Sequence, residues 1–501
     1  MAIAGRAPVI ALVGCGVMGR GIAQVAAAAD CPVLLFDARE GAAREACDTL
    51  AALFDKLQAR GKMTTAAASQ AKGRLTPVTA LRDLATAEIL IEAIVESLDA
   101  KRQLMAALED VVPASCLIAT NTSSLSVTAI AAQCRHPGRV GGYHFFNPVP
   151  LMKVVEVIDG ALTEAWVGDA LTALSHRLGH RPVRARDTPG FIVNHAGRGY
   201  GTEALKILGE TVADVATIDR ILKGAAGFRM GPFELLDLTG LDVSHPVMES
   251  IYRQYYDEPR FRPSPIAAQR LMAGLLGRKS GRGFYDYAEG TPNQTPVTSA
   301  SRPTFAWVAP GHNHVQVTDI VRASGVPLSA TSDAALCVVP LLGEDASSAC
   351  TRLKLDARRS VGIDAVFGVT THRTLVATPA TSDSCRMEAL GMFTADGAAA
   401  SLIQDSVGAV AQRTIALIVN IASDIAQQNI ATPQDIDAAV TLGLGYPQGP
   451  LAWGDAIGPQ IVADILSTML AITGDPRYRP SPWLRRRAQL GLSLLHPAAG
   501  N

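Results

Sequence analysis

The stretch that decides the fold is PVIALVGCGVMGRGIAQVAAA, which covers Pro8–Ala28. Its apolar start, Val9–Val13, is typical of a buried strand, and the alanine-rich end is typical of a helix. Between them Gly14, Gly16 and Gly19 have GxGxxG spacing. The first glycine permits a tight turn, the second lets backbone approach a pyrophosphate, and the third lets the helix pack closely on the strand. We therefore predict a dinucleotide-binding strand, loop and helix.

A second apolar segment, PVLLFD (Pro32–Asp37), ends in an acid at the distance from the loop that this fold requires. Asp37 is expected to accept hydrogen bonds from the adenosine ribose and to repel a 2′-phosphate, which favours NAD over NADP. Arg39 is the nearby residue that would suit NADP instead. The predicted NAD contacts in this region are Gly14, Gly16, Val17, Met18, Gly19 and Asp37.

Composition narrows the class of protein. The 501 residues carry a formal net charge of −1, which argues against nucleic acid or an acidic membrane as partner. The eight cysteines form no CxxC pair, so we expect reduced thiols and no metal site. No apolar run approaches the ~20 residues of a membrane span, and the N-terminal apolar run lacks a signal cleavage site. We expect a soluble cytoplasmic protein without a membrane segment.

Several domains are expected, because single cores stop growing near ~250–300 residues. Strand and helix patterns alternate over 1–187, which predicts an α/β Rossmann-like doubly wound domain. The pattern is helical over 188–287, and a linker rich in Pro, Ser, Thr and Gly follows at 288–303. Short apolar runs without GxGxxG predict a small degenerate α/β insert at 304–400, and a second helical domain at 401–501 completes the chain.

The second helical domain is predicted from an internal repeat. ATIDRILKGAAGFRMGPFELLDLTG (Ala216–Gly240) matches TPQDIDAAVTLGLGYPQGPLAWGDAIG (Thr432–Gly458), with Ile218 aligned to Ile436. A further pair, RFRPSP at Arg260 and RYRPSP at Arg477, lies at nearly the same displacement. Two separate matches at nearly one displacement indicate a duplication of the helical domain.

Two residues downstream of the glycine loop suit alcohol oxidation. His144 lies in GGYHFFNPVP and Glu156 in MKVVEVID. An imidazole can accept the hydroxyl proton while hydride leaves the carbon, and a carboxylate can fix its tautomer. If Lys153–Ile158 is a strand that returns antiparallel to the one before it, the two side chains come within hydrogen-bond reach. The alternative is a buried histidine and a strand-edge glutamate without a catalytic role.

Five separated motifs then carry a family resemblance: EAIVESLDAKRQL, NTSSLSVT, HFFNPVPLMKVVEVI, DTPGFIVN and GFRMGPFELLDLTGLD. Together they resemble the L-3-hydroxyacyl-CoA dehydrogenases of β-oxidation over residues 8–287. The long arrangement, with an insert and a second helical copy, resembles the form of this family that acts on 3-hydroxyadipyl-CoA in phenylacetate degradation. The resemblance implies NAD-dependent oxidation of an (S)-3-hydroxyacyl-CoA to the 3-oxoacyl-CoA.

The resemblance also implies roles for individual residues. His144 corresponds to the general acid/base, Glu156 to its partner carboxylate, Ser123 to the serine that bonds the substrate oxygen, and Asn194 to the asparagine at the thioester end. NTSS as a plain turn and Asn194 as a helix cap stay open as alternatives. Asn194 aligns with Gln412 in the repeat, so the second copy is expected to be structural.

Further contacts follow from the same resemblance. The family places coenzyme A phosphates at the positions of Lys56 and Arg60, and Lys62 lies close by in the sequence. The alternative is that these cations bind no phosphate, because cations at a helix C-terminus interact favourably with the helix dipole in any case. Substrate contacts are thus expected at Lys56, Arg60, Ser123 and Asn194, and further cofactor contacts at Glu96, Lys101, Asn121, Asn147 and Lys279.

Other functions stay open. The same chemistry on 3-hydroxybutyryl-CoA needs no change in the predicted site. A dehydrogenase of free hydroxy acids uses the same pair without coenzyme A. A non-catalytic NAD-binding sensor or scaffold would need no acid/base pair. The duplicated helical domains also leave two assemblies open, a homodimer and a pseudo-dimeric monomer.

Overall fold

The computed structural model describes residues 6–288, 299–333 and 335–497, so residues 289–298 of the predicted linker lie outside it. The chain divides into two compact units. Unit 1 contains Met1–His195 together with Gln428–Gly445. Unit 2 contains Ala196–Gln427 and Tyr446–Asn501. A short segment from the C-terminal half of the chain therefore belongs to the N-terminal unit.

Unit 1 is built on a sheet that has eight strands within its described residues, in the order β3-β2-β1-β4-β5-β6-β7-β8. Neighbouring strands are parallel except β6 and β7, which are antiparallel. This order confirms the predicted Rossmann-like doubly wound sheet. The strands are β1 (Ile10–Val13), β2 (Val33–Phe36), β3 (Leu75–Pro77), β4 (Ile89–Glu92), β5 (Leu117–Thr120), β6 (Val140–Phe145), β7 (Val154–Asp159) and β8 (Arg181–Arg186).

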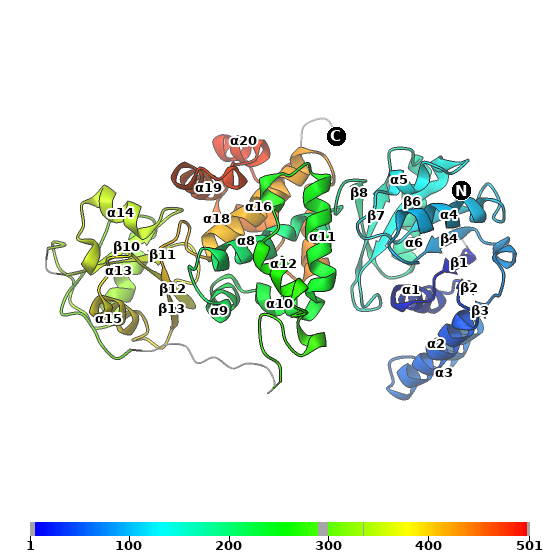
Figure 1. The fold of residues 1–501 in the computed structure, drawn as a ribbon, viewed down its shortest axis with the longest axis horizontal. Coiled ribbons are helices and arrows are strands. Elements are labelled where there is room, and N and C mark those ends of the chain that lie inside the picture. Colours follow the sequence, from blue (N-terminus) through cyan, green and yellow to red (C-terminus); the bar gives the residue numbers. More distant parts are fainter. Residues whose placement is uncertain (1–5, 289–298, 334, 498–501) are drawn as a thin grey trace. The chain divides into compact units, whose positions relative to one another are not determined.

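Helices cover both faces of this sheet, and α2 and α3 form a hairpin that extends beyond it (Figure 1). Helix α17, which is far away in sequence, packs against β7 and β8. The helices of unit 1 are α1 (Val17–Ala28), α2 (Ala42–Ala59), α3 (Thr65–Gly73), α4 (Leu98–Glu109), α5 (Val127–Ala131), α6 (Ala165–Arg177) and α17 (Pro433–Leu444), with α7 (Val193–Ala196) at the boundary and 3-10 turns at Leu81–Leu84 and Pro137–Arg139.

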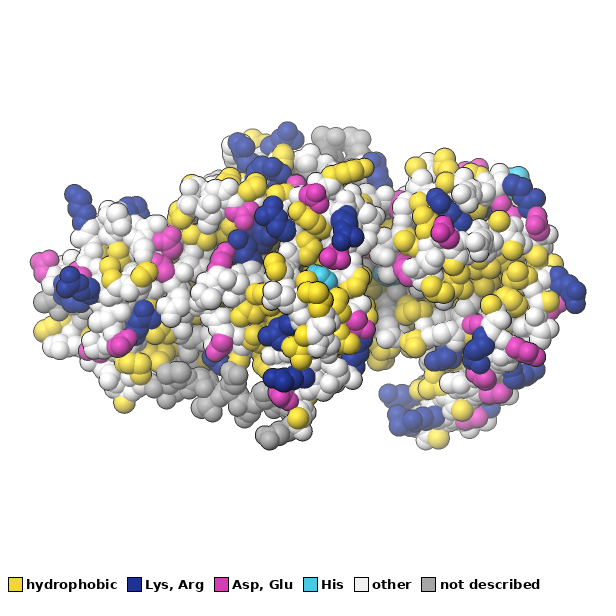
Figure 2. All heavy atoms as spheres, in the orientation of Figure 1, with side chains coloured by type: hydrophobic (Ala, Val, Ile, Leu, Met, Phe, Trp, Pro, Cys, Tyr) yellow, Lys and Arg dark blue, Asp and Glu magenta, His cyan; other side chains and the backbone are white. Residues whose placement is uncertain are grey.

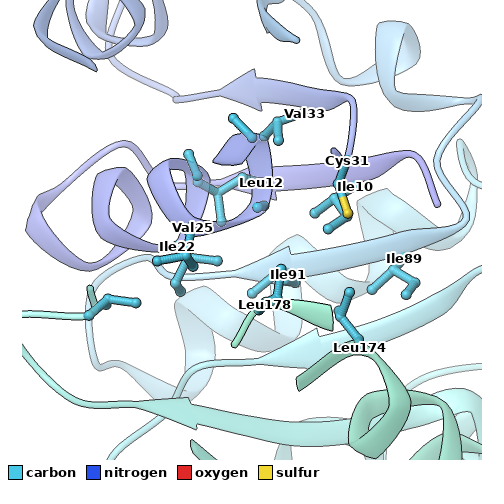
Figure 3. Close-up of a cluster of buried hydrophobic side chains, with 14 of the residues drawn as sticks. Ile10, Leu12, Ile22, Val25, Cys31, Val33, Ile89, Ile91, Leu174 and Leu178 are labelled. Atoms are coloured by element: carbon cyan, nitrogen blue, oxygen red, sulfur yellow. The ribbon is translucent and has the colours of Figure 1, made fainter. Parts of the chain in front are cut away.

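The central strands β1, β4 and β5 are buried at every residue because helices cover both faces of the sheet. Alternate residues of β1 enter different clusters: Ile10 and Leu12 join one, Ala11 and Val13 the other. Figure 3 shows the first cluster, where Ile10 and Leu12 lie with side chains of α1 and α6. Each such buried aliphatic side chain contributes roughly 1.5–3 kcal/mol, so the strand carrying the glycine loop is held on both sides.

Unit 2 contains a group of helices and a smaller sheet. Within its described residues the sheet has five strands in the order β13-β12-β11-β10-β9, again with one antiparallel pair, β11 and β12. The strands are β9 (Ala306–Val308), β10 (Leu336–Leu341), β11 (Ser360–Asp364), β12 (His372–Ala377) and β13 (Ala399–Gln404). The helices are α8 (Arg198–Gly209), α9 (Val215–Ala226), α10 (Pro232–Thr239), α11 (Leu241–Gln254), α12 (Pro265–Met272), α13 (His314–Ala323), α14 (Ala346–Leu353), α15 (Asp383–Phe393), α16 (Ala411–Gln427), α18 (Pro450–Ile457), α19 (Pro459–Thr473) and α20 (Pro482–Leu490), with 3-10 turns η3 (Pro259–Phe261), η4 (Arg278–Ser280), η5 (Ala357–Arg359) and η6 (Pro476–Tyr478).

No single helix in the described part of the chain is both long and apolar enough to cross a membrane. The consecutive helices α18 and α19, which meet at 93°, pass that test only when taken together, on length and composition alone.

Candidate active site

The antiparallel pair β6 and β7 brings the predicted acid/base pair together. The strand register places His144 directly opposite Glu156. The Nδ1 atom of His144 lies 2.6 Å from Oε2 of Glu156. His144 is 5 % exposed and Glu156 is fully buried. Because this bond occupies Nδ1, any proton exchange with a substrate runs through Nε2.

Backbone donors hold the second carboxylate oxygen. Oε1 of Glu156 accepts from the N–H groups of Ile192 and Val193, both at 2.8 Å. The ring of Phe191 lies 5.9 Å from that of His144, centroid to centroid. A buried carboxylate needs such partners, and here they come from the start of α7 rather than from the sheet. Glu156 therefore links the imidazole to the segment that carries Asn194.

The NTSS loop after β5 is organised by Glu96. One oxygen of Glu96 accepts from the backbone N–H groups of Ser123 and Ser124 at 2.8 and 2.9 Å and from the Thr122 hydroxyl at 2.7 Å. The Ser123 hydroxyl lies 3.2 Å from the same oxygen. Burial acts to raise the pKa of Glu96, but Lys101 and these donors outweigh it and lower the pKa. Glu96 thus holds the loop as an anion.

Ser123 and Asn194 are also neighbours. The Asn194 side-chain amide donates to the carbonyl oxygen of Ser123 at 3.3 Å. Asn194 directly follows Val193, whose N–H binds Glu156. Asn121, two residues before Ser123, accepts from the Phe145 N–H at 2.9 Å. The structure therefore brings the four residues predicted to be catalytic, His144, Glu156, Ser123 and Asn194, to one end of β5, β6 and β7.

The glycine loop has the geometry of a phosphate cradle. Gly14 has φ +101°, and a Cβ there would lie 2.5 Å from the Ala93 carbonyl oxygen. A Cβ at Gly19 would lie 1.8 Å from the Gly14 carbonyl oxygen, so helix and turn require glycine at both positions. A Cβ at Gly16 would meet no described atom within 4 Å.

Helix α1 starts at this open position, and no described side chain caps its N-terminus. Its first N–H groups are therefore available to an anion. Asp37 accepts from the Cys15 N–H at 2.7 Å, which joins the end of β2 to the loop. Arg39, the residue that would suit NADP, is exposed and pairs with Glu45 at 2.5 Å. These residues fit NAD.

The other predicted contacts lie in different surroundings. Lys101 is 1 % exposed and pairs with the buried Glu92 at 2.6 Å and with Glu96 at 3.4 Å. Asn147 is exposed in the loop after β6. Lys279 belongs to unit 2, where it pairs with Asp242. Lys56, Arg60 and Lys62 are exposed on the α2–α3 hairpin, and Figure 2 shows cationic side chains gathered at its end.

Sequence reasoning missed two supporting acids. Glu92 accepts from the Thr120 hydroxyl at 2.6 Å and from Lys101, beneath the NTSS loop. Asp187 accepts from the Ser126 hydroxyl at 2.7 Å and from the N–H of Thr128 at 2.7 Å, so it caps α5. Both acids could have been noticed in the sequence, since Glu92 ends a strand and Asp187 precedes a turn. Their partners could not, because they lie up to 61 residues away in the chain.

Comparison with known proteins agrees with this geometry. The family model described as 3-hydroxyacyl-CoA dehydrogenase, NAD binding domain, matches residues 9–188. The model described as 3-hydroxyacyl-CoA dehydrogenase, C-terminal domain, matches residues 190–287 and again residues 408–494. The boundary between the first two matches falls at the Asp187–Asn194 motif.

Individual relatives agree as well. A 3-hydroxyadipyl-CoA dehydrogenase of Escherichia coli is 40% identical over 96% of this chain and 97% of its own length. A probable 3-hydroxybutyryl-CoA dehydrogenase of Deinococcus radiodurans is 38% identical over 55% of this chain and 99% of its own. A crystal structure of 3-hydroxybutyryl-CoA dehydrogenase from Escherichia coli has a TM-score of 0.87 at 37% identity and covers 97% of this chain and 99% of its own. The chain therefore belongs to the 3-hydroxyacyl-CoA dehydrogenase family.

Proposed function

We propose that this protein oxidises (S)-3-hydroxyacyl-CoA to 3-oxoacyl-CoA with NAD⁺ as hydride acceptor, and that 3-hydroxyadipyl-CoA is its substrate. The observation that carries the reaction is the buried pair of His144 and Glu156 at 2.6 Å, in the unit that also holds the glycine loop. The substrate follows from the full-length relative that bears this name.

In this mechanism His144 Nε2 accepts the proton of the 3-hydroxyl group as hydride leaves the same carbon. Glu156 stabilises the imidazolium that forms and keeps Nδ1 as the donor to the carboxylate. NAD⁺, when bound, would be the hydride acceptor, and the glycine loop and Asp37 would hold it. In the reverse direction His144 returns its proton to the oxygen of the 3-oxo group.

The substrate is positioned by Ser123 and Asn194. We expect the Ser123 hydroxyl to bond the reacting oxygen. Glu96 fixes the NTSS loop that carries it through three neighbouring residues. Asn194 is fixed to the same loop through the Ser123 carbonyl. A loop held at this many points costs little reorganisation when the substrate binds.

A second substrate has its own support. The full-length structure with a TM-score of 0.87 is described as a 3-hydroxybutyryl-CoA dehydrogenase. The decisive assay compares 3-hydroxyadipyl-CoA, 3-hydroxybutyryl-CoA and a free 3-hydroxy acid by NADH formation. We expect the highest kcat/KM with the adipyl ester and no turnover of the free acid. A higher kcat/KM with the butyryl ester would replace the proposed substrate, and a pure NAD-binding protein without turnover would indicate the sensor or scaffold.

We further propose that the C-terminal half repeats much of the N-terminal half. The C-terminal family model matches twice, which supports the duplicated helical domain. The two sheets also share a pattern, since each has one antiparallel pair, β6 with β7 and β11 with β12. Asp187 accepts from the N–H groups of Val127 and Thr128, and Asp405 accepts from those of Ala346 and Ser347 in the same way. The insert is then a degenerate version of β4 to β8.

This correspondence explains why the second half would not catalyse. Continuing the register of β11 and β12 by one residue places Asp364 opposite Thr374, where β6 and β7 have His144 and Glu156. Gln412 donates to Asp364 at 2.8 Å. Burial raises the pKa of Asp364 to about 6, against the lowering effect of Gln412 and two backbone N–H groups. The second half therefore has a carboxyl group, bound to Gln412, at the position where the reaction needs an imidazole.

The remaining assignments are part of the same proposal. Coenzyme A phosphates would lie at Lys56 and Arg60. The domain boundaries would follow 1–187, 188–287, a linker at 288–303, 304–400 and 401–501, except that Gln428–Gly445 belongs to unit 1. A cytoplasmic location fits a CoA-linked enzyme. For assembly we propose a pseudo-dimeric monomer, with a homodimer as the alternative, and light scattering with size-exclusion chromatography decides between the chain mass of 52.5 kDa and twice that value.

A further inference from the structure

Helix α17 lies unusually close to the support of the catalytic pair. It comes from the C-terminal half of the chain but belongs to unit 1, where it packs on β7 and β8. A Cβ on Gly443, in its last turn, would lie 3.1 Å from Cγ2 of Val193 and 3.5 Å from Cγ1 of Val154. The close packing of α17 against Val193 therefore depends on glycine at position 443, because a Cβ at 3.1 Å from Val193 is closer than ordinary van der Waals contact.

The two valines flank Glu156 on both sides. Val154 begins β7, and Glu156 follows two residues later in the same strand. Val193 begins α7, and its N–H donates to Glu156 at 2.8 Å. Val154 and Val193 are 0 % and 1 % exposed, so neither can move away into solvent. The last turn of α17 thus packs against the start of β7 and the start of α7, the two segments that Glu156 connects.

Two further contacts keep α17 in place. The carbonyl oxygen of Ile430, just before the helix, accepts from the Arg186 N–H at 2.9 Å. Asp435 in the first turn pairs with Arg181 at 3.2 Å. Ile436, Ala439 and Val440 are buried along the helix. The helix is therefore attached to β8 at its start, while its end reaches Val154 and Val193.

A similar glycine-mediated contact between a helix and a strand occurs inside unit 2. Helix α9 packs on β12, and a Cβ on Gly224 in its last turn would lie 2.7 Å from the ring of His372, the first residue of that strand. Glycine near the end of a helix thus meets the start of a returning strand in both units. Among the described residues of unit 2, His372 at this contact pairs with Ser401 and not with a carboxylate, so the contact offers a control.

We propose that Gly443 is a positioning residue of the dehydrogenase site, through which α17 holds Val193 and β7 so that Glu156 keeps His144 oriented. This inference rests on the proposed function. The C-terminal half of the chain would then contribute to catalysis mechanically, without touching substrate or cofactor. Since a side-chain shift of 1 Å can cost about 100-fold in rate, a few tenths of an ångström at this contact matter.

The test compares Gly443→Ala and Gly443→Val with the wild type, after the wild type has been shown to oxidise a 3-hydroxyacyl-CoA. We expect kcat to fall about threefold for Ala and about 10- to 100-fold for Val, while the Kd for NADH stays unchanged because the glycine loop is on β1 and α1. Adding Val193→Ala removes both Cγ atoms from the contact and should restore kcat of Gly443→Ala to that of Val193→Ala alone.

Gly224→Ala is the control for a purely structural effect. Gly224→Ala should lower Tm without lowering kcat per folded molecule, since Gly224 contacts His372 and not the residues that support Glu156. If Gly443→Val stays folded with kcat unchanged, the inference is wrong. If kcat and NADH affinity fall together and Val193→Ala restores neither, Gly443 is needed only for folding and the inference is also wrong. If Gly443→Val does not fold, Gly443→Ala and its rescue decide. Wild-type enzyme without turnover would instead refute the proposed function.

Discussion

At the scale of single residues, the site depends on a buried carboxylate that has partners on both oxygens. Glu156 binds His144 with one oxygen and two backbone N–H groups with the other. An uncompensated buried carboxylate would cost several kcal/mol, so these bonds are a condition for placing an acid at this position. The same bonds give the imidazole one orientation. Structure and reaction therefore use the same contacts.

Substitution of the pair should remove chemistry and leave binding intact. His144→Ala is expected to lower kcat by about 100- to 10,000-fold, because a general base contributes that much. Glu156→Gln should lower kcat by at least about tenfold, since the amide cannot stabilise the imidazolium as a carboxylate does. Stopped-flow formation of NADH measures the rate, and NADH fluorescence measures binding. Equal losses of rate and of NADH affinity would contradict these roles.

At the scale of elements, the first strand, glycine loop and helix α1 work as one unit. Gly14 and Gly19 are required by backbone contacts inside the protein, whereas Gly16 borders open space. The open position lies at the uncapped start of α1. Packing thus explains two of the glycines, and access for a phosphate explains the third.

Two alanine substitutions separate these reasons. Gly19→Ala should destabilise the fold, because its Cβ would lie 1.8 Å from the Gly14 carbonyl oxygen. Gly16→Ala should leave Tm unchanged and weaken NAD binding by about tenfold or more, because the methyl group occupies the space that a pyrophosphate needs. Thermal unfolding and isothermal titration with NADH test the pair. The expectation fails if Gly16→Ala binds NADH as tightly as the wild type.

The α2–α3 hairpin permits a further prediction at this scale. Lys56→Ala and Arg60→Ala should each raise KM for an acyl-CoA about three- to tenfold, because each removes a charged partner of a phosphate. A truncated N-acetylcysteamine thioester lacks those phosphates and should show no change. Lys72→Ala is the matched control, since Lys72 lies on the same hairpin and pairs with Asp55. Steady-state kinetics with both thioesters would contradict the assignment if KM rose equally for the two.

At the scale of the whole molecule, a buried ionic network joins distant parts of the chain within unit 2. Glu203 on α8 accepts from Arg413 of α16 at 2.7 Å and from Arg477 of η6 at 2.9 Å, and the Tyr478 hydroxyl donates to it at 2.7 Å. Burial opposes the charge on Glu203, but the two arginines outweigh it and lower the pKa to about 2. The network links the two segments that match the same helical family model.

This pKa sets the sign of an acid effect. The folded-state pKa of about 2 lies below the ordinary 4.5, so the unfolded chain binds the proton first as pH falls. The stabilisation is therefore present above pH 4.5 and is lost as pH falls towards 2, and it amounts to on the order of 3 kcal/mol. Glu203→Gln should remove this pH dependence and lower the free energy of unfolding by about 3–5 kcal/mol at neutral pH, because it leaves buried arginines uncompensated.

Urea unfolding followed by tryptophan fluorescence measures both effects, because Trp307, Trp453 and Trp483 lie in unit 2. Glu210→Gln is the matched control: Glu210 also pairs with Arg413 but is 40% exposed, so its loss should cost about 0–1 kcal/mol. An equal loss for the two variants would show that burial does not decide the value of the network.

The sequence alone determined the features that depend on neighbours in the chain. GxGxxG between a strand and a helix, an acid at the end of the next strand and the HFFNP segment are local patterns, and local sterics dictate their conformation. The resemblance then linked His144, Glu156, Ser123 and Asn194 to one reaction. Antiparallel pairing of His144 with Glu156 was also predictable, because both lie in strands that follow each other in the chain, β6 ending at Phe145 and β7 beginning at Val154.

Only the tertiary structure decided which distant groups complete the site. Asp187 caps a helix 59 to 61 residues before it, and Glu96 holds a loop 26 to 28 residues after it. Helix α17 is predicted by its repeat to be part of a second helical domain, yet it lies on the sheet of unit 1. Such contacts depend on how the surfaces of formed elements fit together. The hydrophobic effect that drives this packing is non-directional, so the sequence pattern of one segment does not specify its distant partner. Local patterns therefore identified the catalytic groups, and packing between distant segments determined how they are held.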